Sequence, residues 1–568
     1  MKTHMREEVE KATLEYFEQD ELATNVWITK YCLKNKSGEF LEKSPSDMHE
    51  RLASEFFRVE RKFNTNRALT KEDISGYLNN FKYIVPQGSP MMGVGNDHVN
   101  VSLSNCVVVA PPLDNISSII DTGKDLANLF KRRCGVGLDI SNLRPDNTPV
   151  GNSAGTTSGA WSFADFYSYI CRMIGQNGRR GALMISMDIR HPDIFQFVTM
   201  KHDLAKVTGA NVSIKISDEF MHAVEANKKF TLRFPVESED PIYEQEIEAK
   251  ELWDLVVDSA TKTAEPGLLM WDNILKYLPA NEYEDFKTEC VNPCAELPLS
   301  SYDSCRLISI NLKNFVSNAF ESNASFDFEG FATATASAMR LSDDLVELEL
   351  EKLENLRLVS DQPDEKELWN KLYETCRKGR RTGLGTHGLA DAIASLSLAY
   401  DSDESIEIIN KIYETLKTSS YRESVELAKE RGPFPSFDWE TEKDNLFIKS
   451  LPVDLQEDIS KYGRRNISIL TNAPTGSVSI MSQTSSGLEP VFRNFYIRRR
   501  KLDHSDKNIT ADFVDELGDR WQEFSVYHHN LKQYMNKYDT DDIPEFFIES
   551  DKIDWMKRIE IQSTIQKH

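Results

Sequence analysis

The segment ECVNPCAELPLS, residues 289–300, decides how the rest of the chain is interpreted. A residue that precedes proline is driven away from helical backbone angles, so Asn292-Pro293 predicts a turn that places Cys294 on a loop. In an extended segment, residues two apart point the same way, so the side chains of Asn292, Cys294 and Glu296 are expected to face one small volume. An amide donor, a thiol and a base would then meet in one place.

A single cysteine beside a single glutamate is more often a small buried hydrophobe than a reactive thiol. Two further segments change that balance: SYDSCRLISINL, residues 301–312, carries Cys305, and SNCVVV, residues 104–109, carries Cys106. The pattern Asn-Pro-Cys-x-Glu followed by Asp-Ser-Cys-Arg-Leu resembles the catalytic (large) subunit of ribonucleotide reductase. The resemblance covers nearly the whole chain after the first helices.

Length and composition limit the class of protein. A chain of 568 residues with 40% hydrophobic residues exceeds the size of one ordinary core, which allows one large barrel-type domain with appendages or two domains. The net charge of −24 argues against a nucleic-acid surface, and RRRK at residues 498–501 is interpreted as a solvated strand end or turn. Neither a signal peptide nor a membrane span is predicted, so a cytoplasmic location is expected.

The eight cysteines are sparse for this length and include no C-x-x-C pair. This argues against a disulfide-stapled secreted protein and against a structural zinc site, and it favours catalytic or redox cysteines. No metal site is predicted. The cysteines are Cys32, Cys106, Cys134, Cys171, Cys290, Cys294, Cys305 and Cys376.

The resemblance implies an α/β fold, a ten-stranded α/β barrel with a central finger loop. Residues 1–80 are expected to form a short helical region without a complete ATP-binding cone. One helix there is predicted to start near Asp47, which would cap it, with Glu50 reaching back to the cap. Residues 81–568 are expected to form the barrel, truncated at its carboxyl end. Further barrel strands and a cysteine-pair tail follow in family members, so a split enzyme completed by a second polypeptide is also considered.

The resemblance also implies a mechanism. A thiyl radical on Cys294 abstracts the C3′ hydrogen of a ribonucleotide, while Glu296 takes the 3′-hydroxyl proton and Asn292 orients the ribose. Loss of water at C2′ then draws electrons from Cys106 and Cys305, which end as a disulfide and therefore need Cα atoms within about 7 Å. Thioredoxin or glutaredoxin is the implied reductant of that disulfide.

Two sets of nucleotide-binding residues follow from the same resemblance. Residues 472–480, NAPTGSVSI, offer hydroxyl groups and a glycine to an anion and resemble the family's substrate-phosphate loop. The implied substrate-binding residues are Ser89, Asn105, Pro474, Thr475, Gly476, Ser477 and Val478. The implied residues of the effector site, which selects the base to be reduced, are Asp114, Asn115, Ile116, Arg144, Arg179 and Arg180. The last two belong to a loop that would link effector to substrate.

The radical source is interpreted from three segments. SYDSCRL at residues 301–307, VTGANVS at residues 207–213 and IQSTIQKH at residues 561–568 most resemble the adenosylcobalamin-dependent branch, and a radical from a diiron small subunit stays open as the alternative. The implied enzyme is a ribonucleoside-diphosphate reductase, although a triphosphate substrate is not excluded. Its implied partners are dNTP or ATP effectors and a second copy of the chain in a homodimer. The rival functions are a glycyl-radical enzyme and a truncated or split non-catalytic nucleotide-binding subunit.

Two other patterns are interpreted as structural. GLGTHG at residues 383–388 fits the dinucleotide motif G-x-G-x-x-G, and Asp401 follows at the distance of a ribose-binding acid. The charged residues 376–381 before it do not read as a buried strand, so the glycines are attributed to close helix packing. The alternation VELELEKL at residues 346–353 predicts a helix with one solvated face.

Overall fold

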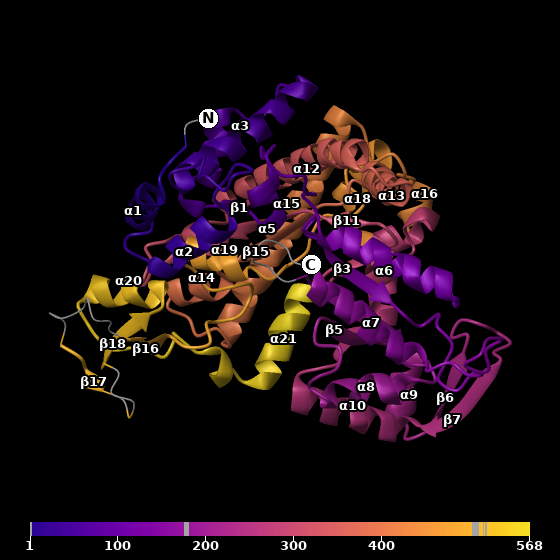
Figure 1. Cartoon of the computed structure of the whole chain (residues 1–568). Coiled ribbons are helices and arrows are strands. Elements are labelled where there is room, and N and C mark those ends of the chain that lie inside the picture. Colours follow the sequence, from indigo (N-terminus) through magenta and orange to yellow (C-terminus); the bar gives the residue numbers. More distant parts are fainter. Residues whose placement is uncertain (1–2, 175–180, 502–509, 515, 517–519) are drawn as a thin grey trace.

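The computed structural model describes residues 3–174, 181–501, 510–514, 516 and 520–568 (Figure 1). Over these ranges the chain is a mixed α/β fold, in which helices surround one six-stranded and one three-stranded sheet. No helix in the described ranges is long and apolar enough to cross a membrane.

The first eighty residues form helices, as the sequence predicts, but α3 begins earlier than expected. Ser44 is its N-cap, and the Asp47 carboxylate accepts hydrogen bonds from the backbone amides of Ser44 and Lys43. Asp47 therefore plays the part expected of Glu50, because Pro45 fixes a helical φ at the first position of the helix. The helices are α1 (Arg6–Tyr16), α2 (Glu21–Lys30), α3 (Pro45–Phe63) and α4 (Lys71–Leu78).

The six-stranded sheet has the order β11-β2-β3-β4-β5-β8, with β11 antiparallel to β2 and the other neighbours parallel. Its central strands are buried throughout, as is usual for parallel strands covered on both faces. The strands are β2 (Cys106–Val108), β3 (Gly135–Asp139), β4 (Leu183–Asp188), β5 (Asn211–Ile216), β8 (Gly267–Met270) and β11 (Ser304–Cys305).

The two faces of this sheet pack against different partners. Val136 and Leu138 of β3 lie in the core formed with helices, whereas Gly137 faces the hairpin of β9 (Thr288–Val291) and β10 (Pro298–Ser300). Because the glycine lacks a side chain, the hairpin backbone comes very close to the sheet. The connecting helices are α6 (Ile116–Phe130), α7 (Ala160–Met173), α8 (Ile194–Thr199), α9 (Asp218–Glu225), α10 (Ala249–Thr263) and α11 (Trp271–Tyr277).

The second sheet has the order β1-β12-β15, with β1 (Ile84–Pro86) antiparallel and β15 (Gly383–His387) parallel to β12 (Leu307–Asn311). The glycine motif at residues 383–388 therefore lies mainly in a strand. A Cβ at Gly385 would lie 2.2 Å from the Thr471 carbonyl oxygen, so this glycine permits close approach of a neighbouring extended segment. The expectation of close helix packing was wrong at this position. Together the sheets give a half-barrel.

Helix α12 (Phe328–Val359) runs through the core between α3, α13 (Pro363–Gly379) and α15 (Asp403–Arg431). The predicted solvated face of residues 346–353 is wrong in part, since Glu349 is fully buried. Helices pack on several sides of α12. The carboxylates of Asp343, Asp344 and Glu347 on this helix therefore pair with arginines. We call this cluster the arginine network; it consists of Arg340, Arg380, Arg431 and Arg465 with Glu60, Asp343, Asp344, Glu347, Glu423 and Glu430.

Smaller elements lie at two ends of the molecule (Figure 1). The RRRK segment lies within strand β16, so it is part of a strand and not a turn. At one end are β16 (Phe495–Lys501), β17 (Phe513–Val514), β18 (Arg520–Tyr527) and α20 (His529–Tyr538), and at the other β6 (Lys229–Phe234) and β7 (Tyr243–Glu248). The remaining helices include α5 (Gly88–Gly93), α14 (Leu389–Ser395), α16 (Trp439–Glu442), α17 (Leu446–Lys449), α18 (Val453–Tyr462), α19 (Gly476–Ser482) and α21 (Trp555–Gln566).

Candidate functional site: a cysteine turn facing two buried thiols

The turn at residues 292–297 joins β9 to β10. Its ends are tied together: the Asn292 amide nitrogen donates to the Leu297 carbonyl at 3.1 Å, and the Leu297 amide donates to Asn292 Oδ1 at 2.9 Å. Ala295 has a φ of 67°, in the left-handed region. The segment is therefore a tight turn and not the extended chain that we expected, because its two ends must meet in the antiparallel hairpin. Cys294 lies exposed on this turn.

Contacts from the six-stranded sheet and from the segment that contains Thr471 fix the turn. Asn211 of β5 donates through Nδ2 to the Pro293 carbonyl at 2.9 Å, and Thr471 donates through Oγ1 to the Glu296 carbonyl at 3.0 Å. A Cβ at Gly137 would lie only 2.0 Å from the Val291 carbonyl oxygen. The position of Cys294 is thus set by segments that are distant in the sequence.

A buried lysine supports the first strand of the hairpin. Lys215 Nζ donates to the Glu289 carbonyl at 2.6 Å, forms an ion pair with Asp139 at 2.9 Å, and lies 4.3 Å from the centre of the Trp271 ring. Burial lowers the pKa of Lys215, but the acidic groups around it, Asp139 first, together outweigh burial and raise that pKa above its ordinary value. Lys215 therefore stays charged beneath the hairpin.

Cys106 of β2 and Cys305 of β11 are directly opposed in antiparallel strands. Opposed residues in such a pair have Cα atoms about 4.5–5.5 Å apart, which falls within the range of a disulfide. Both are buried thiols. The contact with Cys305, followed by burial, raises the pKa of the Cys106 thiol well above its ordinary value. The Cys106 thiol is therefore protonated at neutral pH.

The turn and the thiol pair share one volume. A Cβ added at Gly135 would lie 3.0 Å from Pro293 Cγ and 3.4 Å from Cys106 Sγ, so the missing side chain leaves the two adjacent. The Glu296 carboxylate and the Asn292 amide both act on the pKa of Cys106. The structure therefore brings together the five residues that the sequence assigned to catalysis.

Two polar atoms in this volume have no hydrogen-bond partner among the residues described: Asn292 Nδ2 and Glu296 Oε2. Unpaired buried polar groups are costly, and they are tolerated where a ligand completes them. Burial raises the pKa of Glu296, and the nearby Asn292 amide opposes that rise only in part. A base and a donor are thus left open beside Cys294.

The predicted substrate-binding residues lie around the same thiol pair. Ser89 is buried at the start of α5, and a Cβ at Gly88 would lie 2.6 Å from Asn105 Nδ2. Asn105 Oδ1 accepts a hydrogen bond from the Leu307 amide at 3.2 Å. Each of these residues therefore adjoins one of the two cysteine strands.

The small-residue segment at 474–478 begins next to the thiols. Ala473 packs in the same buried cluster as Cys106 and Cys305. Thr475 Oγ1 accepts a hydrogen bond from the Gly487 amide at 2.8 Å, while Gly476 and Val478 lie in the first turn of α19. The Ser477 hydroxyl contacts the Tyr31 hydroxyl at the end of α2. Pro474 precedes this helix.

The predicted effector residues form a separate group on the outer side of the sheet. Arg144 donates through Nε to Asp114 Oδ2 at 2.7 Å, and Asn115 caps α6 by accepting from the Ser118 amide at 2.9 Å. Ile116 is exposed. The remaining predicted residues of this group, Arg179 and Arg180, lie outside the described residues.

Sequence reasoning missed four positions around the site. Lys215, Glu349 and Tyr31 gain their roles from partners far along the chain, and no local pattern marks them. Gly137 carried a signal: it belongs to the GVG sequence of a glycine-punctuated strand, where close backbone approach is a standard reason for glycine.

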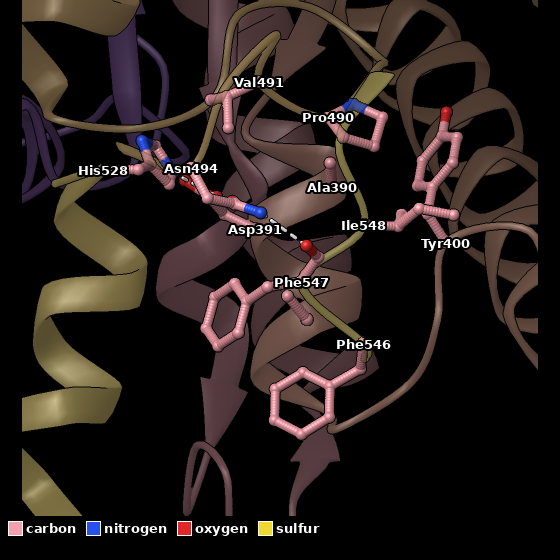
Figure 2. A pocket seen from close by; sticks show the side chains of 11 residues that line it. Ala390, Asp391, Tyr400, Pro490, Val491, Asn494, His528, Phe546, Phe547 and Ile548 are labelled. Carbon is pink, nitrogen blue, oxygen red and sulfur yellow. Dashed lines mark hydrogen bonds and ion pairs between the residues drawn. The ribbon is translucent and has the colours of Figure 1, made fainter. Parts of the chain in front are cut away.

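A small cavity elsewhere is distinct from this site (Figure 2). It has a volume of about 20 Å³, which suits a water molecule and not a nucleotide. Figure 2 shows Asp391, Asn494 and His528 on one side of it, with the His528 ring 2.7 Å from the Asp391 carboxylate. Among the residues that the structure describes, no cluster of His, Cys, Asp or Glu could hold a metal ion.

Comparison with known proteins agrees with this geometry. Residues 104–568 match the family described as "Ribonucleotide reductase, barrel domain". The chain belongs to the ribonucleotide reductase family.

Individual relatives support the assignment. The chain is 29% identical over 510 residues to a vitamin B12-dependent ribonucleoside-diphosphate reductase of Thermoplasma acidophilum, covering 87% of this chain and 60% of the relative. It is 30% identical over 479 residues to one from Mycobacterium tuberculosis (strain CDC 1551 / Oshkosh), covering 84% and 62%. A ribonucleoside-diphosphate reductase large chain of Neurospora crassa is 26% identical over 439 residues, covering 70% and 45%. The chain spans about three fifths of the length of the first two relatives.

Proposed function

We propose that this chain reduces ribonucleotides to 2′-deoxyribonucleotides by thiyl-radical chemistry. The observation that carries the proposal is the meeting of the Cys294 turn with the opposed thiols of Cys106 and Cys305. Family membership supports it, and ribonucleoside diphosphates are the proposed substrates because the relatives from Thermoplasma and Mycobacterium are named for them.

Adenosylcobalamin is the proposed radical source. Cys294 fits that role, since its side chain is exposed and a bound group can approach it. When bound, adenosylcobalamin supplies the one-electron chemistry that leaves a thiyl radical at Cys294. The alternative source is a diiron small subunit. Both radical sources require an accessible thiol at this position. The experiment below distinguishes the two sources.

The residues of the turn then act on the ribose. The Cys294 radical takes the C3′ hydrogen, Glu296 accepts the 3′-hydroxyl proton, and the open Nδ2 of Asn292 donates a hydrogen bond to the sugar. A raised pKa makes Glu296 a stronger base than an ordinary carboxylate once it is ionised. These groups are held before substrate arrives, which lowers the cost of orientation.

The thiol pair completes the reduction. The C2′ hydroxyl leaves as water, and Cys106 and Cys305 together give up two electrons and two protons as their disulfide forms. Each turnover thus converts one ribonucleotide and one dithiol into one deoxyribonucleotide, one disulfide and one water. Thioredoxin or glutaredoxin is the proposed reductant that restores the thiols.

Substrate and effector sites are proposed at the residues already described. Ser89, Asn105 and residues 474–478 would hold the substrate, with its phosphates near the first turn of α19. Asp114, Asn115, Ile116 and Arg144, together with Arg179 and Arg180, would bind a dNTP or ATP effector. The exposed side chains of Ile116 and Ile120 on α6 support a homodimer through that face.

The finer architecture is also a proposal. The half-barrel and the hairpin at its inner face support a ten-stranded barrel with the hairpin as its finger loop. Residues 1–80 would be a helical region without a complete ATP-cone, and residues 81–568 would belong to the barrel.

The test is turnover of a radiolabelled ribonucleoside diphosphate by this chain with dithiothreitol, with and without adenosylcobalamin. Deoxyribonucleotide formed only with the cobalamin supports both the reaction and its radical source. Cys294→Ser should then abolish product, whereas Cys32→Ser, a cysteine outside the site, should retain it. Product from Cys294→Ser would overturn the mechanism. Absence of product from the wild-type chain with the cobalamin would favour the diiron source, the second polypeptide or the non-catalytic nucleotide-binding role.

A further inference from the structure

Glu349 is a fully buried carboxylate of α12 that the proposed reaction does not use. Its oxygens accept hydrogen bonds from three consecutive residues: Ser102 Oγ at 2.5 Å, the Leu103 amide at 2.6 Å and Ser104 Oγ at 2.7 Å. Two residues further along the chain is Cys106. The carboxylate therefore holds the segment that leads into the first thiol of the pair.

Arg306 plays the corresponding part on the other cysteine strand. It follows Cys305 directly, is fully buried, and donates through its guanidinium to Ser304 Oγ at 2.9 Å and to the Ser304 carbonyl at 3.1 Å. Burial raises the pKa of Glu349, and the positive charge of Arg306 is the largest influence that opposes the rise. The two side chains therefore lie close enough to interact electrostatically.

The two anchored segments are also joined to each other. The Asn105 amide donates to the Cys305 carbonyl at 2.9 Å, and the Leu307 amide donates to Asn105 Oδ1 at 3.2 Å. A shift of the segment before Cys106 would therefore move it relative to Cys305. Disulfide geometry is narrow, with Cα atoms about 4.4–6.8 Å apart, so such a shift changes how readily the bond forms.

A purely structural role accounts less well for this carboxylate. Burying a charge costs free energy, and a well-packed apolar residue would stabilise α12 at least as well. Within the part of the chain that the structure describes, all three hydrogen bonds that Glu349 accepts go to one short segment beside a reacting thiol, and none comes from a neighbouring helix. The buried carboxylate of Glu349 therefore lies where the relative position of the two thiols is determined.

We propose that Glu349, together with Arg306, is a positioning residue that sets the thiol–disulfide equilibrium of Cys106 and Cys305. This inference rests on the proposed function of that pair. In the relevant step, one glutathione disulfide takes two electrons and two protons from the two thiols, so that two glutathione thiols and one Cys106–Cys305 disulfide result. Glu349 favours the product by keeping the two sulfur atoms opposed.

The test is a redox titration of the full chain in glutathione buffers, with thiols alkylated and the Cys106–Cys305 peptide quantified by mass spectrometry. Glu349→Gln presents an NH₂ group to donors that need an acceptor, so the segment should move. We expect its equilibrium constant for disulfide formation to fall at least tenfold, which corresponds to about 30 mV in the two-electron potential. Peptide mapping separates this pair from Cys376, whose sulfur also contacts Arg306.

The matched control is Glu442→Gln. Glu442 is equally buried and also accepts three hydrogen bonds, two from Arg464 and one from the Tyr283 hydroxyl, but it lies in a different core cluster. Both variants should lose stability in urea, and only Glu349→Gln should shift the disulfide equilibrium. Equal shifts in the two variants, or none in either, would overturn the role of Glu349.

Two further outcomes differ from those of the redox titration above. If Glu349→Gln does not fold, Ser104→Ala removes one of the three hydrogen bonds with less disruption and should shift the equilibrium in the same direction by a smaller factor. No shift in that variant would count against the proposal. If the wild-type chain itself forms no Cys106–Cys305 disulfide under oxidising buffer, the proposed dithiol chemistry fails, and the positioning role fails with it.

Discussion

Two acids of this chain have opposite electrostatics: the half-buried Glu296 in the turn beside Cys294 and the fully buried Asp343 in the arginine network. Burial raises the pKa of both carboxyl groups, because it removes the water that stabilises their charge. At Asp343 the surrounding guanidinium groups outweigh burial, Arg380 first, and hold the pKa well below its usual range. At Glu296, no lysine or arginine of the described chain forms an ion pair, and the pKa stays raised.

The difference separates a structural acid from a reactive one. The charge of Asp343 is neutralised by the arginines around it, which help to tie three helices together, so Asp343 serves as a structural acid. The turn keeps an unpaired acceptor and an unpaired donor, which cost stability and remain available to a substrate. Four substitutions test whether this division holds.

The largest effect is expected from Arg431→Met in the arginine network. Arg431 is fully buried and pairs with Glu60 of α3 and with Asp343 and Asp344 of α12. Removing it leaves buried carboxylates without their cation, which typically costs about 3–5 kcal/mol of unfolding free energy. Urea unfolding followed by circular dichroism measures this loss.

The control for Arg431→Met is Arg422→Met. Arg422 is half exposed and, among the described residues, pairs with Asp454 alone, and an ion pair this exposed contributes little to stability. If the two variants unfold at similar urea concentrations, the arginine network does not hold the three helices together. The structural role that distinguishes this network from the turn would then be wrong.

The next effect is expected from Gly137→Ala, which attacks the turn through its support. A methyl group at this position would meet the Val291 carbonyl oxygen, which belongs to the hairpin backbone. Overpacking of this kind costs about 1–3 kcal/mol. Gly151→Ala, where a Cβ meets nothing within 4 Å, should change stability by less than about 0.5 kcal/mol. Urea unfolding compares the two, and equal stability would mean that the hairpin lies further from the sheet.

The hairpin turn and the arginine network also show what the sequence could and could not predict. The turn at Asn292-Pro293 follows from the restricted geometry around proline, which is local, and the resemblance supplied the cysteine residues. The left-handed Ala295 and the return of the chain at Leu297 were missed, because they depend on hairpin pairing. The local sequence pattern predicted a turn, and contacts with distant residues determined the conformation of that turn.

Burial was the main failure. The sequence treated the charged residues 376–381 as unlike a buried segment, yet Arg380 and Arg381 are almost wholly buried, and Glu349 lies in the core. An isolated charged residue is a poor candidate for burial, and only a partner of opposite sign makes it tolerable. Those partners lie tens to hundreds of residues away, so no window along the chain reveals them.

A smaller effect is expected from Asn292→Ala within the turn. The substitution removes the acceptor of the Leu297 amide, and a hydrogen bond of this kind contributes about 0.5–1.5 kcal/mol to stability. It also removes the open Nδ2 donor, so kcat/KM should fall at least about tenfold under the proposed mechanism. Asn355→Ala, an exposed asparagine of α12, is the control and should leave both quantities near the wild-type values. Unchanged kcat/KM in Asn292→Ala would remove this residue from the site.

The smallest effect on stability, and the one of opposite sign, is expected from Glu296→Gln. A carboxyl group whose pKa is raised by folding binds its proton more tightly in the folded chain, so its contribution is fully present below the unfolded pKa of about 4.3. That contribution is lost as the pH rises through the raised folded value. Glutamine does not titrate, so the variant should gain on the order of 1 kcal/mol over the wild type at pH 8 and nothing at pH 4.

Asp343→Asn provides the matched measurement from the arginine network, with the sign reversed. A carboxyl group whose pKa is depressed by folding stabilises the chain above its unfolded pKa of about 3.9 and loses that contribution as the pH falls. Asp343→Asn should therefore be strongly destabilised at pH 8 and approach the wild type in acid, whereas Glu296→Gln should separate from the wild type only as the pH rises. Urea unfolding of both variants at pH 2, 4, 6 and 8 gives the two curves: Glu296→Gln should depart from the wild type between pH 4 and 8, and the difference between Asp343→Asn and the wild type should shrink only below about pH 4. If the stabilities of the two variants relative to the wild type change with pH in the same direction, Glu296 and Asp343 have the same electrostatic environment, and the contrast between the two acids is wrong.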